Sequence, residues 1–214
     1  MTILGIPVLT LITFFPLAGL LVVLFIPGRR PGAVRVLATA VTGLEFLATL
    51  ALLPGFNSGS GDMQFVERAS WIPAFHVQYL MGIDGISLLL ILLTSLLTFL
   101  AVLSSWKAIA DRVKEYYAFM LLLEVGMIGV FVSLDLVLFY VFWEVMLIPM
   151  YLLIGVWGDP KRRIYAAIKF FLFTMAGSVL MLVAILILYF INLRATGKAT
   201  FDVLELYKLG IPVG

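Results

Sequence analysis

The sequence predicts an all-α, polytopic membrane protein, a single membrane domain over residues 1–214 with six transmembrane helices. Two observations support this fold class: the composition and the presence of six long apolar stretches. Of the 214 residues, 64% are apolar and 12% are charged, and the mean hydropathy is +1.18. Soluble domains are about 45–50% apolar and about 25% charged. Too few polar residues are present to cover a soluble core of this size, so we expect the bilayer to be the solvent.

The six apolar stretches are each long enough to cross about 30 Å of hydrocarbon as a helix. Helices are expected because, in lipid, each backbone polar group must find its partner within the same segment. Basic residues follow the first stretch rather than precede it, which is the reverse of a removable signal peptide, so we expect this stretch to remain as a membrane helix. The predicted spans are residues 3–26, 36–53, 86–103, 116–134, 136–157 and 170–191.

The distribution of basic residues over the loops predicts the orientation. The loops after the first and third spans carry three basic residues each, three more cluster after the fifth span, and the loop after the second span carries only Arg68. By the positive-inside rule, the amino terminus lies outside and the odd-numbered loops are cytoplasmic. The basic residues that set this orientation are Arg29, Arg30, Arg35, Lys107, Arg112, Lys114, Lys161, Arg162 and Arg163.

Two segments outside the spans have patterns of their own. Residues 55–84 are rich in Gly, Ser and mixed polar residues, and within them Phe75, Val77 and Tyr79 alternate with polar positions. This alternation predicts a small outer hairpin with one face on the helices. Apolar residues within 201–209 have helical spacing beside charged residues, which predicts a short interfacial helix.

Three glutamates, Glu45, Glu124 and Glu144, lie inside otherwise apolar spans. A carboxylate at mid-bilayer costs on the order of 3 kcal/mol unless it is paired, hydrated or protonated, so each is a functional candidate. At a rise of about 1.5 Å per residue, Glu124 and Glu144 fall at similar depth on successive helices, where two carboxyl groups could share or pass a proton. Glu45 has no distinguishing neighbour, and we expect it to be structural.

Glu144 has the most informative surroundings. Pro149, five residues later, must interrupt the hydrogen bonding of the helix, which frees carbonyl groups that can hold water or a cation. Burial favours the neutral form of a carboxyl group and a nearby ammonium favours the ionised form, so movement of one lysine could switch Glu144 between holding and releasing a proton. The alternative, for both Glu144 and Glu124, is a permanently protonated side chain that is hydrogen-bonded to a neighbouring helix.

Lys169 is the lysine best placed to act on Glu144. It lies beyond the basic cluster at 161–163, in the amino-terminal part of the sixth helix. Its flexible stem could direct the ammonium group towards Glu144, or towards the cytoplasmic surface by snorkelling. We therefore predict a proton-translocation site that contains Glu144 and Lys169, with Glu124 as an additional member.

The composition also excludes several kinds of chemistry. The sequence contains no cysteine, so disulfides, thiolate zinc sites and iron–sulfur clusters cannot form within it, and its single histidine, His76, excludes bis-histidine haem. His76 has no other metal ligand near it in the sequence, so we expect no metal and no cofactor in this chain. The net charge of +2, without a dense basic run, gives no footprint for nucleic acid.

Three segments together resemble the antiporter-like membrane subunits of NADH–quinone oxidoreductase, respiratory complex I. The resemblance is greatest to the amino-terminal part of the subunit M family, called chain 4 in organelles. The FWE motif followed by PMY, and the basic loop leading to KFF, are specific together and weak singly. The segments are MGIDGISLLLILLT (81–94), SLDLVLFYVFWEVMLIPMYLLIGVWG (133–158) and RRIYAAIKFFLFTMAGS (162–178).

The resemblance implies a function and a set of partners. Members of the family translocate protons across the membrane, driven by electron transfer from NADH to quinone in other subunits. The chain would then be a subunit of an NADH:quinone oxidoreductase with no redox chemistry of its own. The essential glutamate of the family matches Glu144, and its functionally important lysine matches Lys169. The implied surroundings are the bacterial cytoplasmic membrane and other complex I subunits, which would hold the NADH, FMN, iron–sulfur clusters and quinone.

The sequence departs from the family in its length. Family members have further membrane helices, whose central lysines have no counterpart here, so we expect a partial antiporter-like fold that does not conduct protons alone. Subunits of Mrp-type cation/proton antiporters share the fold and the glutamate, and the resemblance leaves that function open. A structural fragment that transports nothing is a third interpretation.

Overall fold

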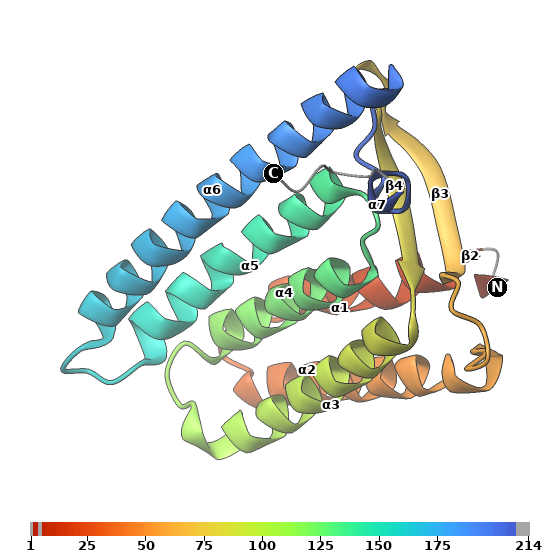
Figure 1. Cartoon of the computed structure of the whole chain (residues 1–214). Coiled ribbons are helices and arrows are strands. Elements are labelled where there is room, and N and C mark those ends of the chain that lie inside the picture. Colours follow the sequence, from red (N-terminus) through yellow and green to blue (C-terminus); the bar gives the residue numbers. More distant parts are fainter. Residues whose placement is uncertain (1, 4–5, 209–214) are drawn as a thin grey trace.

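The computed structural model describes residues 2–3 and 6–208 and contains six long helices (Figure 1). Each is long and apolar enough to cross a membrane, which confirms the predicted all-α fold with six spans. The helices are α1 (Val8–Phe25), α2 (Pro31–Leu50), α3 (Gly85–Ala108), α4 (Val113–Val132), α5 (Leu136–Trp157) and α6 (Arg163–Thr196).

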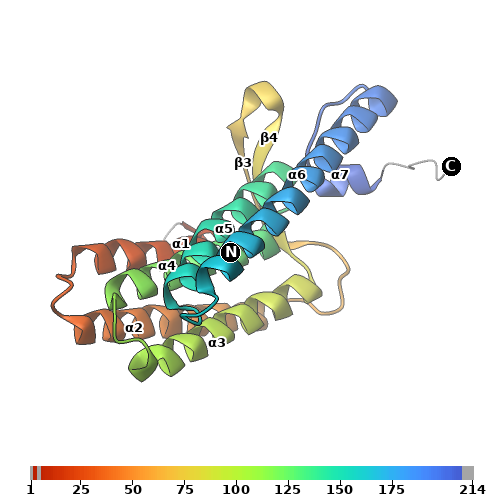
Figure 2. The same cartoon turned by 90° about the vertical axis from the view of Figure 1, so that its left-hand side faces the viewer.

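The first four helices form a bundle to which the last two are added in order. α1 packs against α2 and α4, and α3 packs against the same two helices. α5 then packs on α4, and α6 packs on α5. Figure 1 shows the resulting layers, with α6 outermost, and Figure 2 shows the same arrangement from the side. We call α1–α4 the four-helix bundle.

The two ends of the helices differ in character. The basic residues cluster in the links α1–α2, α3–α4 and α5–α6 and in the helix turns beside them, and we call this side the basic end. The opposite side, which we call the hairpin end, carries a β-hairpin and a short helix, on the right in Figure 1. The elements outside the long helices are β1 (Thr2–Ile3), β2 (Ile6–Pro7), η1 (Leu53–Gly55), β3 (Gln64–Ile72), η2 (Pro73–Phe75), β4 (Val77–Ile83) and α7 (Val203–Tyr207).

The structure corrects the start of the first predicted span. α1 begins at Val8 rather than at residue 3, because β1 and β2 pair as short antiparallel strands. Residues 4–5 of the predicted span lie outside the described residues. Pro7 explains the boundary: its ring holds the preceding residue in an extended conformation, and Pro7 itself occupies the N-cap position of α1.

Other helices extend beyond the apolar stretches that predict them. α6 begins at Arg163 rather than at residue 170 and continues to Thr196, where Gly197 ends it with a φ of 72°. α2 begins at Pro31, a residue that fits the first position of a helix. A hydropathy count detects only the part of a helix that lies in lipid, so it misses the polar turns at the helix ends.

β3 and β4 form an antiparallel hairpin within the segment predicted to hold one. His76 makes the turn in a left-handed conformation, with a φ of 57°. Leu80 and Met81 of β4 are both completely buried, and Met81 packs in an apolar core with residues of α1, α3, α4 and α5. The carbonyl group of Leu80 accepts a hydrogen bond from the N–H of Leu134, so β4 also pairs with the α4–α5 link. α7 lies within the predicted interfacial helix, whose residue 209 lies outside the described residues.

Carboxylate side chains cap the helices at the hairpin end, because the first N–H groups of a helix have no partner inside it. Asp84, Asp135 and Asp202 cap α3, α5 and α7 respectively. Asp202 also accepts a hydrogen bond from Arg68 of β3 at 2.8 Å. The hairpin and α7 are therefore joined by an ion pair.

α1 receives its cap from a distant part of the chain. Its N-cap residue, Pro7, makes no side-chain hydrogen bond. Instead, the Glu67 carboxylate of β3 accepts hydrogen bonds from the N–H groups of Leu9 and Thr10, at 2.7 and 2.9 Å, and from the Thr10 hydroxyl at 2.7 Å. A negative charge at this position is also favourable to the helix dipole. The hairpin therefore fixes the position of α1.

We expect Glu67→Ala to lower the free energy of unfolding by about 1–3 kcal/mol, because it leaves the buried N–H group of Leu9 and the partly buried N–H group of Thr10 without an acceptor. Chemical unfolding in detergent micelles, followed by circular dichroism, measures the change. Asp62→Ala is the control, since Asp62 is exposed in the loop before β3. Equal stability of the two variants would contradict the capping role.

A second prediction concerns Asp84, which accepts a hydrogen bond from the N–H of Ser87 at 2.7 Å. This hydrogen bond lowers the pKa of the carboxyl group. A folded-state pKa below the unfolded one gives stabilisation that is present above the unfolded pKa and is lost as the pH falls through the folded one. We expect Asp84→Ala to cost about 1 kcal/mol near neutral pH and progressively less in acid. A cost that stays constant over this pH range, measured by the same unfolding assay, would refute the assignment.

Candidate functional site

Glu144 lies near the middle of α5 and faces α6. The Tyr140 hydroxyl, one turn earlier on α5, lies next to its carboxyl group, and Ser178 of α6 lies beside the same hydroxyl. Glu144 is half-buried, and its buried Oε1 atom has no hydrogen-bond partner among the described residues. A free acceptor is therefore held at the interface of two membrane helices.

Pro149 adds a second free acceptor close to Glu144. It is buried within α5, which continues through it to Trp157. Because its ring nitrogen carries no hydrogen, the carbonyl group of Val145, four residues earlier, loses its donor in the helix. Val145 follows Glu144 directly. α5 therefore lacks one backbone hydrogen bond next to the residue that carries the carboxyl group.

Lys169 lies on the face of α6 that points away from α5. Ala167 marks the facing side, since it is buried and its Cβ lies 3.5 Å from the position that a Cβ would take at Gly155 of α5. Successive residues of a helix turn by about 100°, so Lys169 is rotated by about 200° from Ala167. Its side chain is exposed, and its ammonium group lies 5.8 Å from the ring centre of Tyr165, one turn nearer to the basic end.

The structure does not bring Lys169 to Glu144. Of the two orientations considered for Lys169, it shows the one directed towards the basic end. Among the described residues, the ion pairs are Arg68–Asp202, Arg112–Glu115 and Lys208–Glu205, none of which contains Glu144 or Lys169. The role of Lys169 as a charge partner of Glu144 stays a prediction.

α4 and α5 approach each other closely at two glycines. A Cβ atom at Gly129 would overlap the Phe142 ring, and one at Gly126 would overlap the Met146 side chain. Small residues at such positions let the backbones of membrane helices come together. The register places Glu144 level with residues 127–128 of α4, about one helical turn from the level of Glu124.

Glu124 points away from this contact and therefore away from Glu144. It is separated from Gly126 by about 200° around α4. Its carboxyl group lies side by side with that of Glu45 on α2. Both side chains are 0% exposed, and their four oxygens have no donor among the described residues. The structure thus corrects two expectations: Glu124 adjoins Glu45 rather than Glu144, and Glu45 has a neighbour that the sequence does not reveal.

The space between α4, α5 and α6 is apolar. A cavity of about 250 Å³ there is bounded mostly by Leu, Met and Phe side chains. Its polar members are Thr174 and Trp143, and the Trp143 indole N–H is buried without an acceptor among the described residues. This cavity adjoins the α5 segment that carries Glu144, but it provides no charged group for it.

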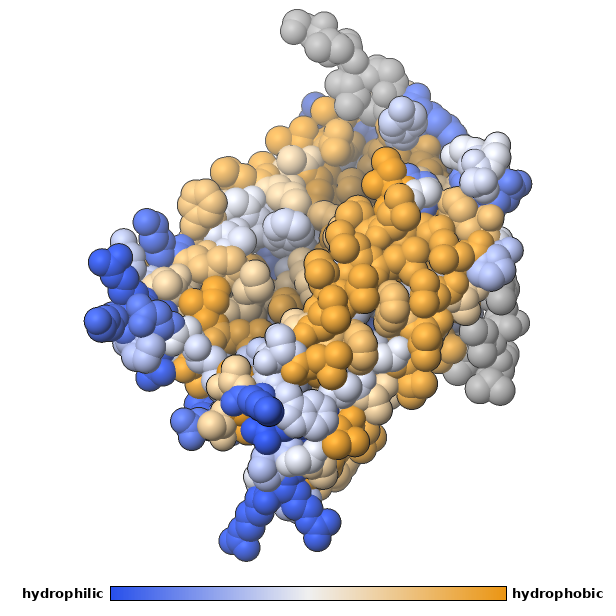
Figure 3. Space-filling view, turned by 90° about the horizontal axis from the view of Figure 1, so that it is seen from below, coloured by the Kyte–Doolittle hydropathy of each residue, from blue (hydrophilic) through white to orange (hydrophobic). Residues whose placement is uncertain are grey.

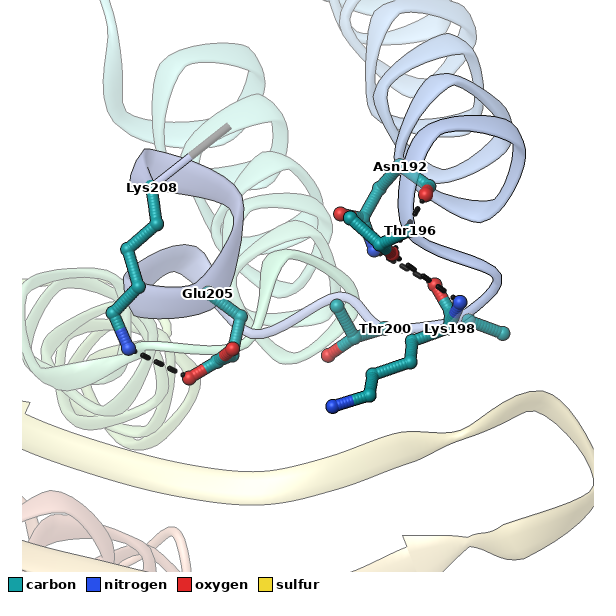
Figure 4. Close-up of a pocket in the computed structure, with 7 residues that line it drawn as sticks. Asn192, Thr196, Lys198, Thr200, Glu205 and Lys208 are labelled. Carbon is teal, nitrogen blue, oxygen red and sulfur yellow. Dashed lines mark hydrogen bonds and ion pairs between the residues drawn. The ribbon is translucent and has the colours of Figure 1, made fainter. Parts of the chain in front are cut away.

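A polar pocket of about 590 Å³ lies at the hairpin end, where α6 stops (Figure 4). Asn192 donates a hydrogen bond to the Lys198 carbonyl group at 2.8 Å, and Lys208 pairs with Glu205 at 2.9 Å. This pairing lowers the pKa of Glu205. The pocket shares no residue with the intramembrane glutamates. Within the described part of the chain, no three His, Cys, Asp or Glu side chains are placed to hold a metal ion.

We expect Gly129→Ala to destabilise the fold by about 1–3 kcal/mol, because the added methyl group overlaps the Phe142 ring and forces α5 away from α4. Gly177→Ala is the matched control, since a Cβ on this α6 residue meets no atom within 4 Å. Thermal unfolding in detergent measures both variants. If the two substitutions are tolerated equally well, the close contact of α4 and α5 does not determine stability.

The fold and the buried glutamates define a class of protein: polytopic membrane proteins that carry ionisable side chains within their spans. Two family models match the chain. One, described as "NADH:quinone oxidoreductase/Mrp antiporter, TM", matches residues 133–211, and the other, "NADH-ubiquinone oxidoreductase chain 4, amino terminus", matches residues 62–133. The chain therefore belongs to the family of antiporter-like membrane subunits of NADH–quinone oxidoreductase.

Individual relatives agree with this assignment. The chain is 47% identical over 208 residues to NADH-quinone oxidoreductase subunit M of Rhodobacter capsulatus, covering 95% of this chain and 39% of the relative. It is 43% identical over 175 residues to NADH-ubiquinone oxidoreductase chain 4 of Arabidopsis thaliana, covering 82% of this chain and 35% of the relative. The chain thus spans well under half the length of these relatives.

Solved structures show the same fold. A chain of respiratory complex I from Thermus thermophilus with bound NADH matches with a TM-score of 0.77 and 30% identity, over 92% of this chain and 38% of that one. A chain of the Mrp complex from a Dietzia species matches with a TM-score of 0.72 and 19% identity, over 90% of this chain and 20% of that one. At that identity, the second match shows the fold alone.

Proposed function

We propose that the chain is part of a proton-translocating membrane subunit of an NADH–quinone oxidoreductase. The observation that carries the proposal is the position of Glu144, whose unpartnered carboxyl oxygen lies at the α5–α6 interface, in a chain related to subunit M. Electron transfer takes place in other subunits, and this chain contributes a carboxyl group that takes up and releases the proton.

Glu144 holds the transported proton, and Lys169 is the cation that changes its charge state. An ammonium group close to a carboxyl group favours its ionised form, and withdrawal of the ammonium favours the protonated form. In this arrangement the Lys169 side chain is exposed and withdrawn from Glu144. Conformational or electrostatic coupling to neighbouring subunits brings the cation closer and expels the proton.

We also propose an orientation in the bacterial cytoplasmic membrane. The basic end would face the cytoplasm, and the hairpin end, with the amino terminus, would face outside. The support is the concentration of Lys and Arg in and beside the three links of the basic end. Between the two ends, the molecule presents a broad apolar surface to lipid and to neighbouring membrane subunits (Figure 3).

A second candidate function is that of a subunit of an Mrp-type cation/proton antiporter. The description of the family model that covers residues 133–211 favours it, because it names both kinds of complex. The two functions differ in their energy source: an antiporter exchanges protons for sodium without NADH. A purely structural role is the remaining candidate.

We expect Glu144→Gln to reduce NADH-driven proton pumping to background in the complete complex, because the amide cannot exchange a proton. Glu144→Asp keeps an ionisable carboxyl group and should retain part of the activity. Glu115→Gln, at the basic end where Glu115 pairs with Arg112, should pump normally. Inverted membrane vesicles with a pH-sensitive dye measure pumping, and NADH oxidation is recorded in parallel.

Two results would contradict the proposal. Normal proton pumping per NADH in the Glu144→Gln variant would favour the structural role. Proton movement that requires sodium and proceeds without NADH would favour the antiporter. Retained NADH oxidation in detergent shows that the variant complex has assembled, which separates a lost proton site from a lost complex.

A further inference from the structure

The four-helix bundle contains a second group of buried polar side chains, on the opposite side of α4 from α5 and Glu144. Each of the four helices contributes at least one member, and none is more than 4% exposed. The group comprises Thr13 of α1, Thr42, Glu45 and Thr49 of α2, Ser95 and Thr98 of α3, and Glu124 of α4.

The helix contacts place these residues within about two turns of one another along the bundle. Gly19 of α1 is in close contact with Val41 of α2, since a Cβ atom at Gly19 would lie 2.7 Å from the Val41 methyl groups. Counted from this contact along the two antiparallel helices, Thr13 lies within about one turn of the level of Glu45. Gly43 of α2 meets Phe99 of α3, which puts Thr98 at that level too. Thr49 and Ser95 are hydrogen-bonded at 2.9 Å, about one turn nearer to the hairpin end.

Glu45 and Glu124 are the only carboxyl groups in this layer of the described residues, and they adjoin each other without a donor. Two carboxylates side by side in a low-dielectric interior repel each other and are not hydrated, so both cannot be ionised. Thr13 Oγ1 is equally buried and equally without a partner among the described residues. The layer thus combines two acidic groups with a hydroxyl whose hydrogen-bonding capacity is unused.

No cation on the four helices compensates for the pair. Their other charged residues are Arg35, Lys107, Lys114 and Glu115, all towards the basic end. Arg35 lies ten residues before Glu45, about 15 Å along α2, and donates to the Ile109 carbonyl group at 2.8 Å. Lys114 lies equally far from Glu124 and donates to the Leu24 carbonyl group at 2.6 Å.

The hydroxyl groups of the two tyrosines of α4 form hydrogen bonds with α3 and not with the Glu45–Glu124 pair. The Tyr116 hydroxyl shares a hydrogen bond with Ser105 at 2.8 Å, and the Tyr117 hydroxyl donates to the Val102 carbonyl group at 3.4 Å. Both contacts lie towards the basic end of α3. Among the residues of these four helices, none neutralises the charge of the Glu45–Glu124 pair, so only bound protons can do so.

We propose that Glu45 and Glu124 form a second proton-holding site, which carries two protons at rest and releases one. With two protons, each acid O–H group donates to the oxygen of the other, and the pair is neutral. When one proton leaves to the aqueous medium, the remaining proton is shared between two oxygens in a charge-assisted hydrogen bond. The Thr13 hydroxyl then donates to the anionic oxygen. A single buried carboxyl group has neither stabilisation, so it would keep its proton.

The test is an infrared titration of the chain in lipid nanodiscs, in the Glu144→Gln background so that Glu144 contributes no signal. The carbonyl stretching band of protonated carboxyl groups is followed from neutral to alkaline pH, where exposed carboxyl groups are already ionised. We expect the band to fall to about half as one of the two protons leaves. Because Glu144 is absent throughout, the outcome is independent of the proposed function of Glu144.

Substitutions test the pairing. In Glu45→Leu and in Glu124→Leu, the remaining carboxyl group has no partner to share its proton with, so the band should persist across the pH range. Glu115→Gln, which changes only an exposed carboxylate, should leave the half-loss unchanged. Thr13→Val should raise the pH at which the band falls to half, and Thr13→Ser should return this pH to its value in the parent chain.

If a leucine variant fails to fold, Glu45→Gln provides the test, because its amide donates to the ionised Glu124 and should abolish the band at a lower pH than in the parent chain. A band in the parent chain that does not change with pH would overturn the proposal, because both protons would then be permanent. A band that still falls to half in both leucine variants would overturn the proposal as well. A band that falls when sodium replaces choline at fixed pH would instead identify a cation site.

Discussion

The contact between α4 and α5 is the constraint on which the arrangement of the buried carboxyl groups depends. Apolar side chains alone drive little association of helices in lipid, so close packing at small residues has to supply it. Gly126 and Gly129 do so by admitting Met146 and Phe142 of α5. A glutamate two residues from such a contact residue points to the opposite side of its helix. Glu124 therefore faces α2, and Glu144 faces α6.

The sequence predicts the spans well and the helix ends poorly, and both results have a physical cause. Lipid selects apolar side chains, so the six hydrophobic stretches locate the six helices. The ends lie in polar surroundings, where specific contacts decide. α1 starts after Pro7, and its cap comes from Glu67, nearly sixty residues away in the chain, on the first strand of the hairpin. No capping pattern in the sequence around Pro7 predicts that contact.

For a related reason, the sequence predicts only part of the candidate site. Glu144 stands out through Pro149 and its motif, whereas Glu45 has no local signal. In a soluble helix the polar face shows which side meets solvent, but a membrane helix is apolar on its buried side and on its lipid side alike. The depth of a residue in the membrane can be counted along the chain from the end of its helix. The direction in which its side chain points cannot be counted in this way. Equal depth suggests that Glu124 is close to Glu144, and rotation about α4 directs it to Glu45 instead.

The opposite directions of the two carboxyl groups limit how they can influence each other. Between Glu124 and Glu144 lies the close contact of two glycines with Phe142 and Met146, whose side chains offer no hydroxyl or carboxyl group to carry a proton. The side chains at this contact therefore provide no direct route from one carboxyl group to the other. A closely packed interface is stiff, because a small displacement meets steric overlap. A shift of α5 that changes the surroundings of Glu144 would move α4 with it and alter the distance between Glu124 and Glu45. A mechanical coupling of the two carboxyl sites through this interface therefore depends on the absence of side chains at positions 126 and 129.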